Sequence, residues 1–292
     1  MPHPLLTSPL MRDLLPLALG AAFAIFFIAF GIHRNRKLSQ PMTRIRRDAL
    51  FAADWVAVLA LQTPSDARQL WQAAEAVGPH EAEKALQVLE HPDTRREWAT
   101  YPEYWLVMAH ALRNAERPER AVAAAREAFS RAELSARWVA NAWCLLRELG
   151  ETPPSHEANR VLGVIAEVGE RHGSVAFVAY QDGEAARHLF NRSVGSTRQL
   201  GGEKARAAAV SLVQAGGAAA AAFHAVAEYP PPPAGRIRFT LLTPAGLRTT
   251  SELEEWEAGT PAHPLHGACA ALKRLSWVAR DAETPPRKAL RP

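Results

Sequence analysis

An uninterrupted apolar stretch near the start of the chain, residues 14–32, constrains the fold more than any other feature and contains no charged residue. At about 1.5 Å per residue, a helix of this length would span roughly 28 Å, which is close to the hydrocarbon thickness of a bilayer. A signal peptide would end in a small-residue cleavage site, and a buried core helix would carry polar residues on one face. We therefore expect a transmembrane helix over 14–32, preceded by a short external tail over 1–13.

Basic residues follow this stretch, whereas Arg12 is the only arginine or lysine before it. Because positively charged flanks stay on the cytoplasmic side, the asymmetry predicts a single-pass protein of a bacterial inner membrane, with its N-terminus outside and its body in the cytoplasm. The juxtamembrane segment over 33–47 is also expected to contact anionic lipid head groups. The alternative is that its charges act only as a topology signal. Its basic residues are Arg34, Arg36, Lys37, Arg44, Arg46 and Arg47.

The charge of the body of the chain, residues 48–281, indicates which kinds of partner molecule the protein binds. The chain of 292 residues has a net charge of +4, but the segment 33–47 and the tail 282–292 together carry more positive charge than that, so the body between them is acidic. An acidic body argues against a nucleic-acid partner, which needs a basic face. Cys144 and Cys269 lie in apolar helical contexts and are too few for a disulfide framework, so we expect free thiols in a reducing compartment. The tail 282–292 is expected to be disordered.

Short amphipathic helices joined by capped turns are predicted for the first half of the body, residues 48–155. The apolar residues from Trp105 onward resemble a tetratricopeptide repeat, and Val139 begins a second copy thirty-four residues later. The repeated residues are Trp105, Met108, Ala109, Leu112, Ala121, Ala125 and Ala128, followed by Val139, Ala142, Trp143 and Leu146. The resemblance implies stacked helical hairpins with a peptide-binding face, whereas a generic helical hairpin with alanine-rich packing is the alternative.

The helical pair over 105–129 has alanines at positions where larger side chains would fill the space between the helices. This pattern indicates a shallow apolar groove. We expect a segment of an unidentified partner protein to dock there, with surface arginines at the rim that tune the association rate. These rim residues are Arg113, Arg120 and Arg126. The tryptophans of this half are expected in the core; they are Trp98, Trp105, Trp138 and Trp143.

The second half of the body, residues 156–281, changes to the alternating pattern of β-strands. The signals of tight turns occur at Asp182-Gly183 and over 243–246. Strands joined by hairpins form an antiparallel sheet with helices on one face, so we expect an α+β domain. Strands are predicted over 161–168, 174–180, 185–191, 195–200, 236–242 and 247–251, and helices over 203–226 and 264–280.

Several short motifs of this half resemble an uncharacterised, membrane-anchored family of bacterial proteins. They are residues 162–169 (LGVIAEVG), 179–183 (AYQDG), Ala186-Arg187, Asn191 and 242–246 (LTPAG). The resemblance covers most of this half and implies no activity. The order of elements is also similar to that of secretion chaperones with α+β folds, which is an analogy of fold alone.

Two clusters in this half contain residue types that bind metals or phosphates. His263, His266 and Cys269 are zinc-ligand types at helical spacing, but a fourth ligand is not evident. The glycine-rich segment 195–204 lacks the Gly-Lys-Ser/Thr end of a phosphate-binding loop. We therefore expect a histidine-rich first helical turn and an ordinary helix start, with no metal and no cofactor.

Three carboxylates, Glu167, Asp182 and Glu184, are predicted near one edge of the sheet, where such groups are usually solvated. They are the best acid–base candidates in the sequence. Because we expect them to be solvated, we expect no catalytic site. The favoured function is a membrane-tethered adaptor or assembly component that binds another protein. The alternative is an enzyme of unrecognised type, for which a deep polar pocket in the α+β half would be evidence.

Overall fold

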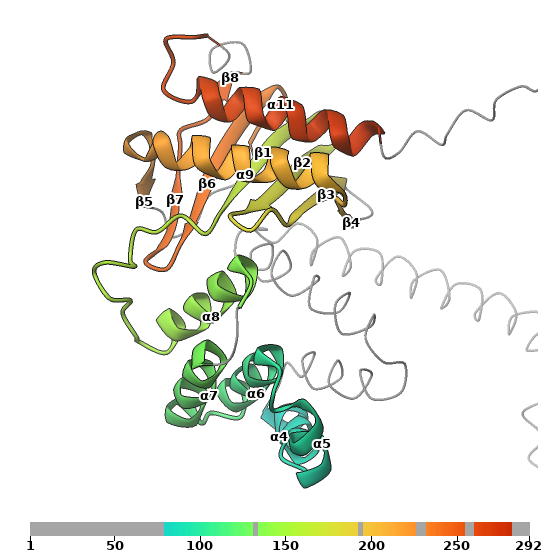
Figure 1. Ribbon diagram of the computed structural model, residues 1–292, viewed down its shortest axis with the longest axis vertical. Helices are drawn as coiled ribbons and strands as arrows, with labels where there is room; N and C mark the ends of the chain where they lie inside the picture. The colour runs from blue at the N-terminus through green and yellow to red at the C-terminus, as the bar shows by residue number, and fades with distance from the viewer. Residues whose placement is uncertain (1–78, 131–133, 192–194, 226–231, 255–259, 282–292) are drawn as a thin grey trace, which may run out of the picture. The chain divides into compact units, whose positions relative to one another are not determined.

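The computed structural model describes residues 79–130, 134–191, 195–225, 232–254 and 260–281, all within one compact unit that spans Ile45–Pro292 (Figure 1). The described chain begins with helices and continues into an antiparallel sheet with two further helices. The helices are α4 (Pro79–Leu89), α5 (Pro92–Trp98), α6 (Pro102–Asn114), α7 (Pro118–Ser130), α8 (Ala136–Glu148), α9 (Glu203–Ala218) and α11 (His266–Asp281).

Proline opens each of the helices α4, α5, α6 and α7. Its fixed φ and missing N–H suit the first turn of a helix, where the N–H has no partner inside the helix. The face of α7 that packs inward is made of alanines, which allow neighbouring helices to approach closely. These alanines are Ala121, Ala124, Ala125 and Ala128, and all are buried.

One sheet of eight antiparallel strands follows within the described residues, in the order β4-β3-β2-β1-β6-β7-β5, and β8 pairs with β6. The two predicted tight turns are present, and Gly183 and Gly246 have φ values of 90° and 131°. The strands are β1 (Gly163–Glu170), β2 (Gly173–Tyr180), β3 (Ala185–Asn191), β4 (Gly195–Gln199), β5 (His224–Ala225), β6 (Arg236–Thr243), β7 (Gly246–Thr249) and β8 (Leu253–Glu254).

The two faces of the sheet belong to two different cores, because successive side chains of a strand point to opposite faces. Val164 and Phe239 lie on the face covered by α9 and α11, and both residues share a core with these helices (Figure 1). Ile165 and Val178 lie on the opposite face, in the core that also contains α6, α7 and α8. The helical half and the sheet therefore share one apolar core.

The close approach of α9 to the sheet depends on Gly216. A Cβ at this position would lie 2.8 Å from Val164 Cγ2 and 3.2 Å from Leu241 Cδ2. Glycine lowers helix propensity, but here it provides the space that helix–sheet packing needs. The helix ends at Ala218, earlier than the predicted end near 226, because the chain turns through Ala220–Ala222 into β5.

The prediction of a transmembrane fold is contradicted. Among the residues that the structure describes, no helix is both long enough and apolar enough to cross a bilayer. The longest described helices, α9 and α11, have 16 residues each, which is fewer than the ~20 apolar residues that a span requires. The predictions of a single-pass topology and an inner-membrane location are contradicted on the same ground. The stretch 14–32, the basic segment 33–47 and the tail 282–292 themselves lie outside the described residues.

Candidate functional site

The candidate site lies in the helical half, where α6 and α8 repeat each other. Both helices have 13 residues, and α8 begins thirty-four residues after α6. The helix between them, α7, packs against both. The offset predicted from Trp105 and Val139 is therefore also the offset between two whole helices. Of the four tryptophans, Trp98, Trp138 and Trp143 are buried as predicted, and Trp105 is half-buried.

The same left-handed turn ends both helices. Glu116 follows α6 with a φ of 59°, and Gly150, thirty-four residues later, follows α8 with a φ of 88°. In each turn a backbone N–H bonds to a carbonyl five residues earlier, which defines a Schellman cap. The repeat thus extends from the helices into their capping turns. The bonds are Arg117 N–H to Leu112 O and Glu151 N–H to Leu146 O, both 2.9 Å.

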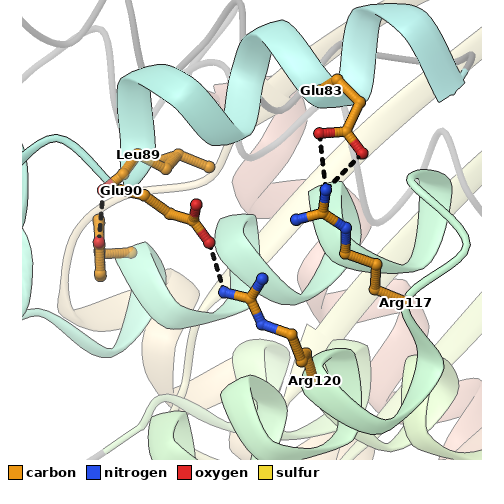
Figure 2. Close-up of polar contacts among 6 residues, drawn as sticks. Glu83, Leu89, Glu90, Arg117 and Arg120 are labelled. Atoms are coloured by element: carbon orange, nitrogen blue, oxygen red, sulfur yellow. Dashed lines mark hydrogen bonds and ion pairs between the residues drawn. The ribbon is translucent and has the colours of Figure 1, made fainter.

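Arginine–glutamate ion pairs join the elements of this half. Figure 2 shows Arg117 donating to both carboxylate oxygens of Glu83, at 2.8 and 2.9 Å. In the same region the hydroxyl of Tyr104 donates to Leu89 O at 2.7 Å. Exposed pairs of this kind each contribute about 0–1 kcal/mol to stability. The remaining pairs are Arg120 with Glu90 (Figure 2), Arg113 with Glu148 at 2.5 Å and Arg126 with Glu151 at 2.5 Å.

The three arginines predicted at a partner-binding rim are all members of these pairs. Arg120 and Arg126 lie on the exposed side of α7 with Ala123 between them, whereas Arg113 lies near the end of α6. Their charges are balanced by glutamates of the same chain. Because the inward alanines of α7 are buried in helix packing, the accessible surface is the opposite side of the helix. We call this surface the α7 face, made of Glu119, Arg120, Ala123, Arg126 and Ser130.

Hydrogen bonds connect both ends of α8 to hairpins of the sheet. At the first turn of the helix, Asp182 Oδ2 accepts a hydrogen bond from Ala136 N–H at 2.7 Å, so the β2–β3 hairpin caps the helix. Near the last turn, Arg147 donates to Pro244 O at 2.5 Å, in the turn between β6 and β7. The sequence predicted no second helix that would pack against α8 as α7 packs against α6. In the structure, α8 contacts these two hairpins.

The three candidate carboxylates do not gather into one site. Asp182 Oδ1 accepts from Glu184 N–H at 3.2 Å, and Glu184 lies 3.6 Å from Arg137, so both groups stabilise the hairpin and its contact with α8. Glu167 pairs in register with Ala176, in the middle of β2, and therefore lies away from that hairpin. The predicted edge cluster is absent from the described residues.

A row of buried polar side chains crosses the sheet face that is turned away from α9 and α11. Glu167 on β1 lies opposite Arg238 on β6, and Arg238 donates to Glu252. His188 on β3 belongs to the same row across β2, and burial lowers its pKa to about 4. The exposed fractions are 2% for Glu167, 2% for His188 and 4% for Arg238. Only the strand order assembles this row, which explains why the sequence pattern does not indicate it.

The metal and phosphate candidates have structural roles. His263 Nδ1 accepts from Leu265 N–H at 3.1 Å, His266 is the first residue of α11, and Cys269 is buried in the core. Within the described residues, histidines, cysteines and acids form no group that would hold a metal ion. The segment 195–204 contains β4, and only a short connection separates that strand from α9.

No family model, no curated protein and no solved structure matches this chain. The resemblance of 162–169 and 242–246 to a bacterial family therefore stays a prediction. The function is argued from the geometry of the described residues.

Proposed function

We propose that this protein is a protein-interaction module whose α7 face binds a segment of a partner protein. The observation that supports the proposal is the repetition of α6 and α8, which have the same length, the same capping turn and a thirty-four-residue offset. Helical repeats of this period bury their apolar faces against one another and leave extended surfaces on which partners bind.

The α7 face is favoured over the neighbouring helices because it is accessible. Ten residues of α8 are buried, and most of α6 is buried as well. On α7, Ala123 lies three residues from Arg120 and three from Arg126, so the small residue is flanked by two guanidinium groups on one side of the helix. Such a surface offers apolar contact at its centre and charged contact at its edges, as interfaces commonly do.

For the rival proposal, an enzyme, the polar row of Glu167, His188 and Arg238 is the candidate that we consider among the described residues. These side chains combine an acid, a base and a cation, but they are 2–4% exposed. A substrate has no access to groups that are closed to solvent in this conformation. The polar row is therefore better explained as part of the buried interior, and binding remains the favoured function.

The test is capture of partner proteins by the full-length chain and by the variant Ala123→Glu. The new glutamate is compatible with an exposed helix position and changes the centre of the α7 face, so we expect the captured proteins to be lost. Gln87→Glu introduces the same residue on exposed α4 and is the matched control. Equal capture by all three proteins would exclude the α7 face, and turnover of a metabolite without any capture would favour the enzyme.

A charge exchange separates partner contact from internal stability. Arg120→Glu alone leaves two carboxylates facing each other, whereas Arg120→Glu with Glu90→Arg restores the ion pair in the opposite direction. We expect the double variant to recover the stability of the wild type, within about 1 kcal/mol, but to bind its partner more weakly. If partner capture recovers together with stability, Arg120 serves the fold and not the interface.

A further inference from the structure

The outer side of α11 presents a tryptophan to solvent. Trp277 is 64% exposed, whereas the inward side of the same helix contributes Leu272, Leu275 and Ala279 to the core. The one other large apolar side chain that is exposed among the described residues, Tyr101, lies in the helical half and is 46% exposed. An exposed tryptophan on the outer side of a helix is the kind of side chain that anchors protein interfaces.

Cations surround Trp277 at helical spacing. Lys273 and Arg274 precede it by four and three residues, and Arg280 follows it by three. Residues three and four apart are neighbours on the helix surface, so these charges and the indole share one face. The acid among these close neighbours is Asp281, four residues after Trp277. We call this set, Lys273, Arg274, Trp277 and Arg280, the α11 face.

Arg274 and Arg280 donate hydrogen bonds to serines. Arg274 Nη2 donates to Ser211 Oγ of α9 at 3.1 Å. Arg280 donates from Nε to Ser276 O and from Nη2 to Ser276 Oγ, both at 3.4 Å. A guanidinium has five N–H donors, so Arg274 retains donors for a further acceptor after its bond to Ser211. Side chains that are ordered before binding lose less entropy when a partner arrives.

We propose that the α11 face binds an acidic segment of another protein, with Trp277 as the apolar anchor and the three cations as partners for its carboxylates. Charge complementarity supports this occupant, because the face is positive although the body of the chain is acidic. A nucleic acid is disfavoured because it needs a broader basic surface than one helix face provides. This site is separate from the α7 face and does not depend on it.

The test uses the full-length chain and a short fluorescein-labelled peptide in which pairs of glutamates alternate with leucine and phenylalanine. We expect binding by fluorescence anisotropy that weakens as salt is raised. Trp277→Ala and Lys273→Glu should each weaken binding about tenfold. Tyr101→Ala is the matched control, since it removes the other exposed aromatic residue, and it should bind as the wild type does. Trp277→Gln is the substitute if the alanine variant does not fold.

Several outcomes would overturn the proposal. They are equal binding by Trp277→Ala, equal binding of a peptide with lysines in place of the glutamates, and no binding of the acidic peptide at all. Tighter binding of a single-stranded oligonucleotide than of the acidic peptide would assign the face to a nucleic acid. Self-association that sedimentation detects in the wild type and not in Trp277→Ala would assign it to a second copy of this chain.

Discussion

At the scale of single residues, ion pairing and burial determine whether a charged side chain stabilises the fold or is available to a partner. Arg113, Arg120 and Arg126 were predicted to tune association with a partner, but each already has a glutamate of the same chain within ion-pair distance. Sequence spacing identifies an exposed arginine on a helix, but it does not show which carboxylate of another helix lies opposite. That information requires the packing of the helices.

Burial of His188 makes the stability of the fold depend on pH. Its pKa in the folded chain is about 4, below the ordinary value of 6.5, because burial disfavours the charged imidazole. The unfolded chain therefore binds a proton more readily between these two values, and stability is lost as the pH falls from about 6.5 to about 4. The loss from this one group is on the order of 3 kcal/mol.

Denaturant unfolding of the wild type and of His188→Gln at neutral and at acidic pH measures this effect. We expect a smaller decrease in the free energy of unfolding for the variant, whatever its stability at neutral pH. His156→Gln, at an exposed histidine, should retain the pH dependence of the wild type. The same pH dependence in all three proteins would contradict the assignment to His188.

At the scale of elements, several strands followed from the sequence, but helices pack on both faces of the sheet and not on one face as predicted. The predicted strands over 174–180, 185–191 and 236–242 agree with β2, β3 and β6 to within a residue or two, because β-period alternation and turn residues are local signals. The two-residue strands β5 and β8 are too short to show a period. The position of β6 beside β1 is a long-range pairing, and it was therefore not predictable from local pattern, nor was the polar row that this pairing creates.

The capping turns offer a direct test of the repeat. Glu116 adopts a φ of 59°, a region that costs a residue with a side chain about 1 kcal/mol or more relative to glycine. We expect Glu116→Gly to stabilise the protein by about 1 kcal/mol and Gly150→Ala, at the equivalent turn, to destabilise it by about 1 kcal/mol. Thermal unfolding of the two variants provides the measurement. Opposite signs support equivalent turns, whereas two effects of the same sign would show that the turns differ.

At the scale of the whole molecule, α8 connects the helical half to the sheet. The predicted division at residue 155 separates two kinds of pattern, but the core of the helices continues into Ile165 and Val178 of the sheet. Sequence composition reveals where the pattern changes. It does not reveal whether the two halves share a core, because that depends on how side chains from distant segments meet.

Loss of the Asp182 cap should therefore affect both halves. Asp182→Ala removes the acceptor for Ala136 N–H, and we expect a loss of about 1–2 kcal/mol, as for other helix caps. Hydrogen exchange should become faster in α8 and in β2 and β3 together. Asp93→Ala, at an exposed aspartate of α5, is the control and should leave the sheet unchanged. Faster exchange in α8 alone would show that the halves open independently.

The late position of β6 in the chain has a consequence for biosynthesis. A ribosome releases α8 before either of the hairpins that fasten it, and the turn that contacts Arg147 follows β2, β3, β4 and α9. During that interval β1 has an unpaired edge, which is a template for aggregation. A chain that terminates before β6 would keep this edge permanently and would leave α8 without its second attachment. We therefore expect newly made and truncated copies to depend on chaperones more than the complete folded chain does. We expect proteases to cleave these copies most readily at the junction between α8 and the sheet.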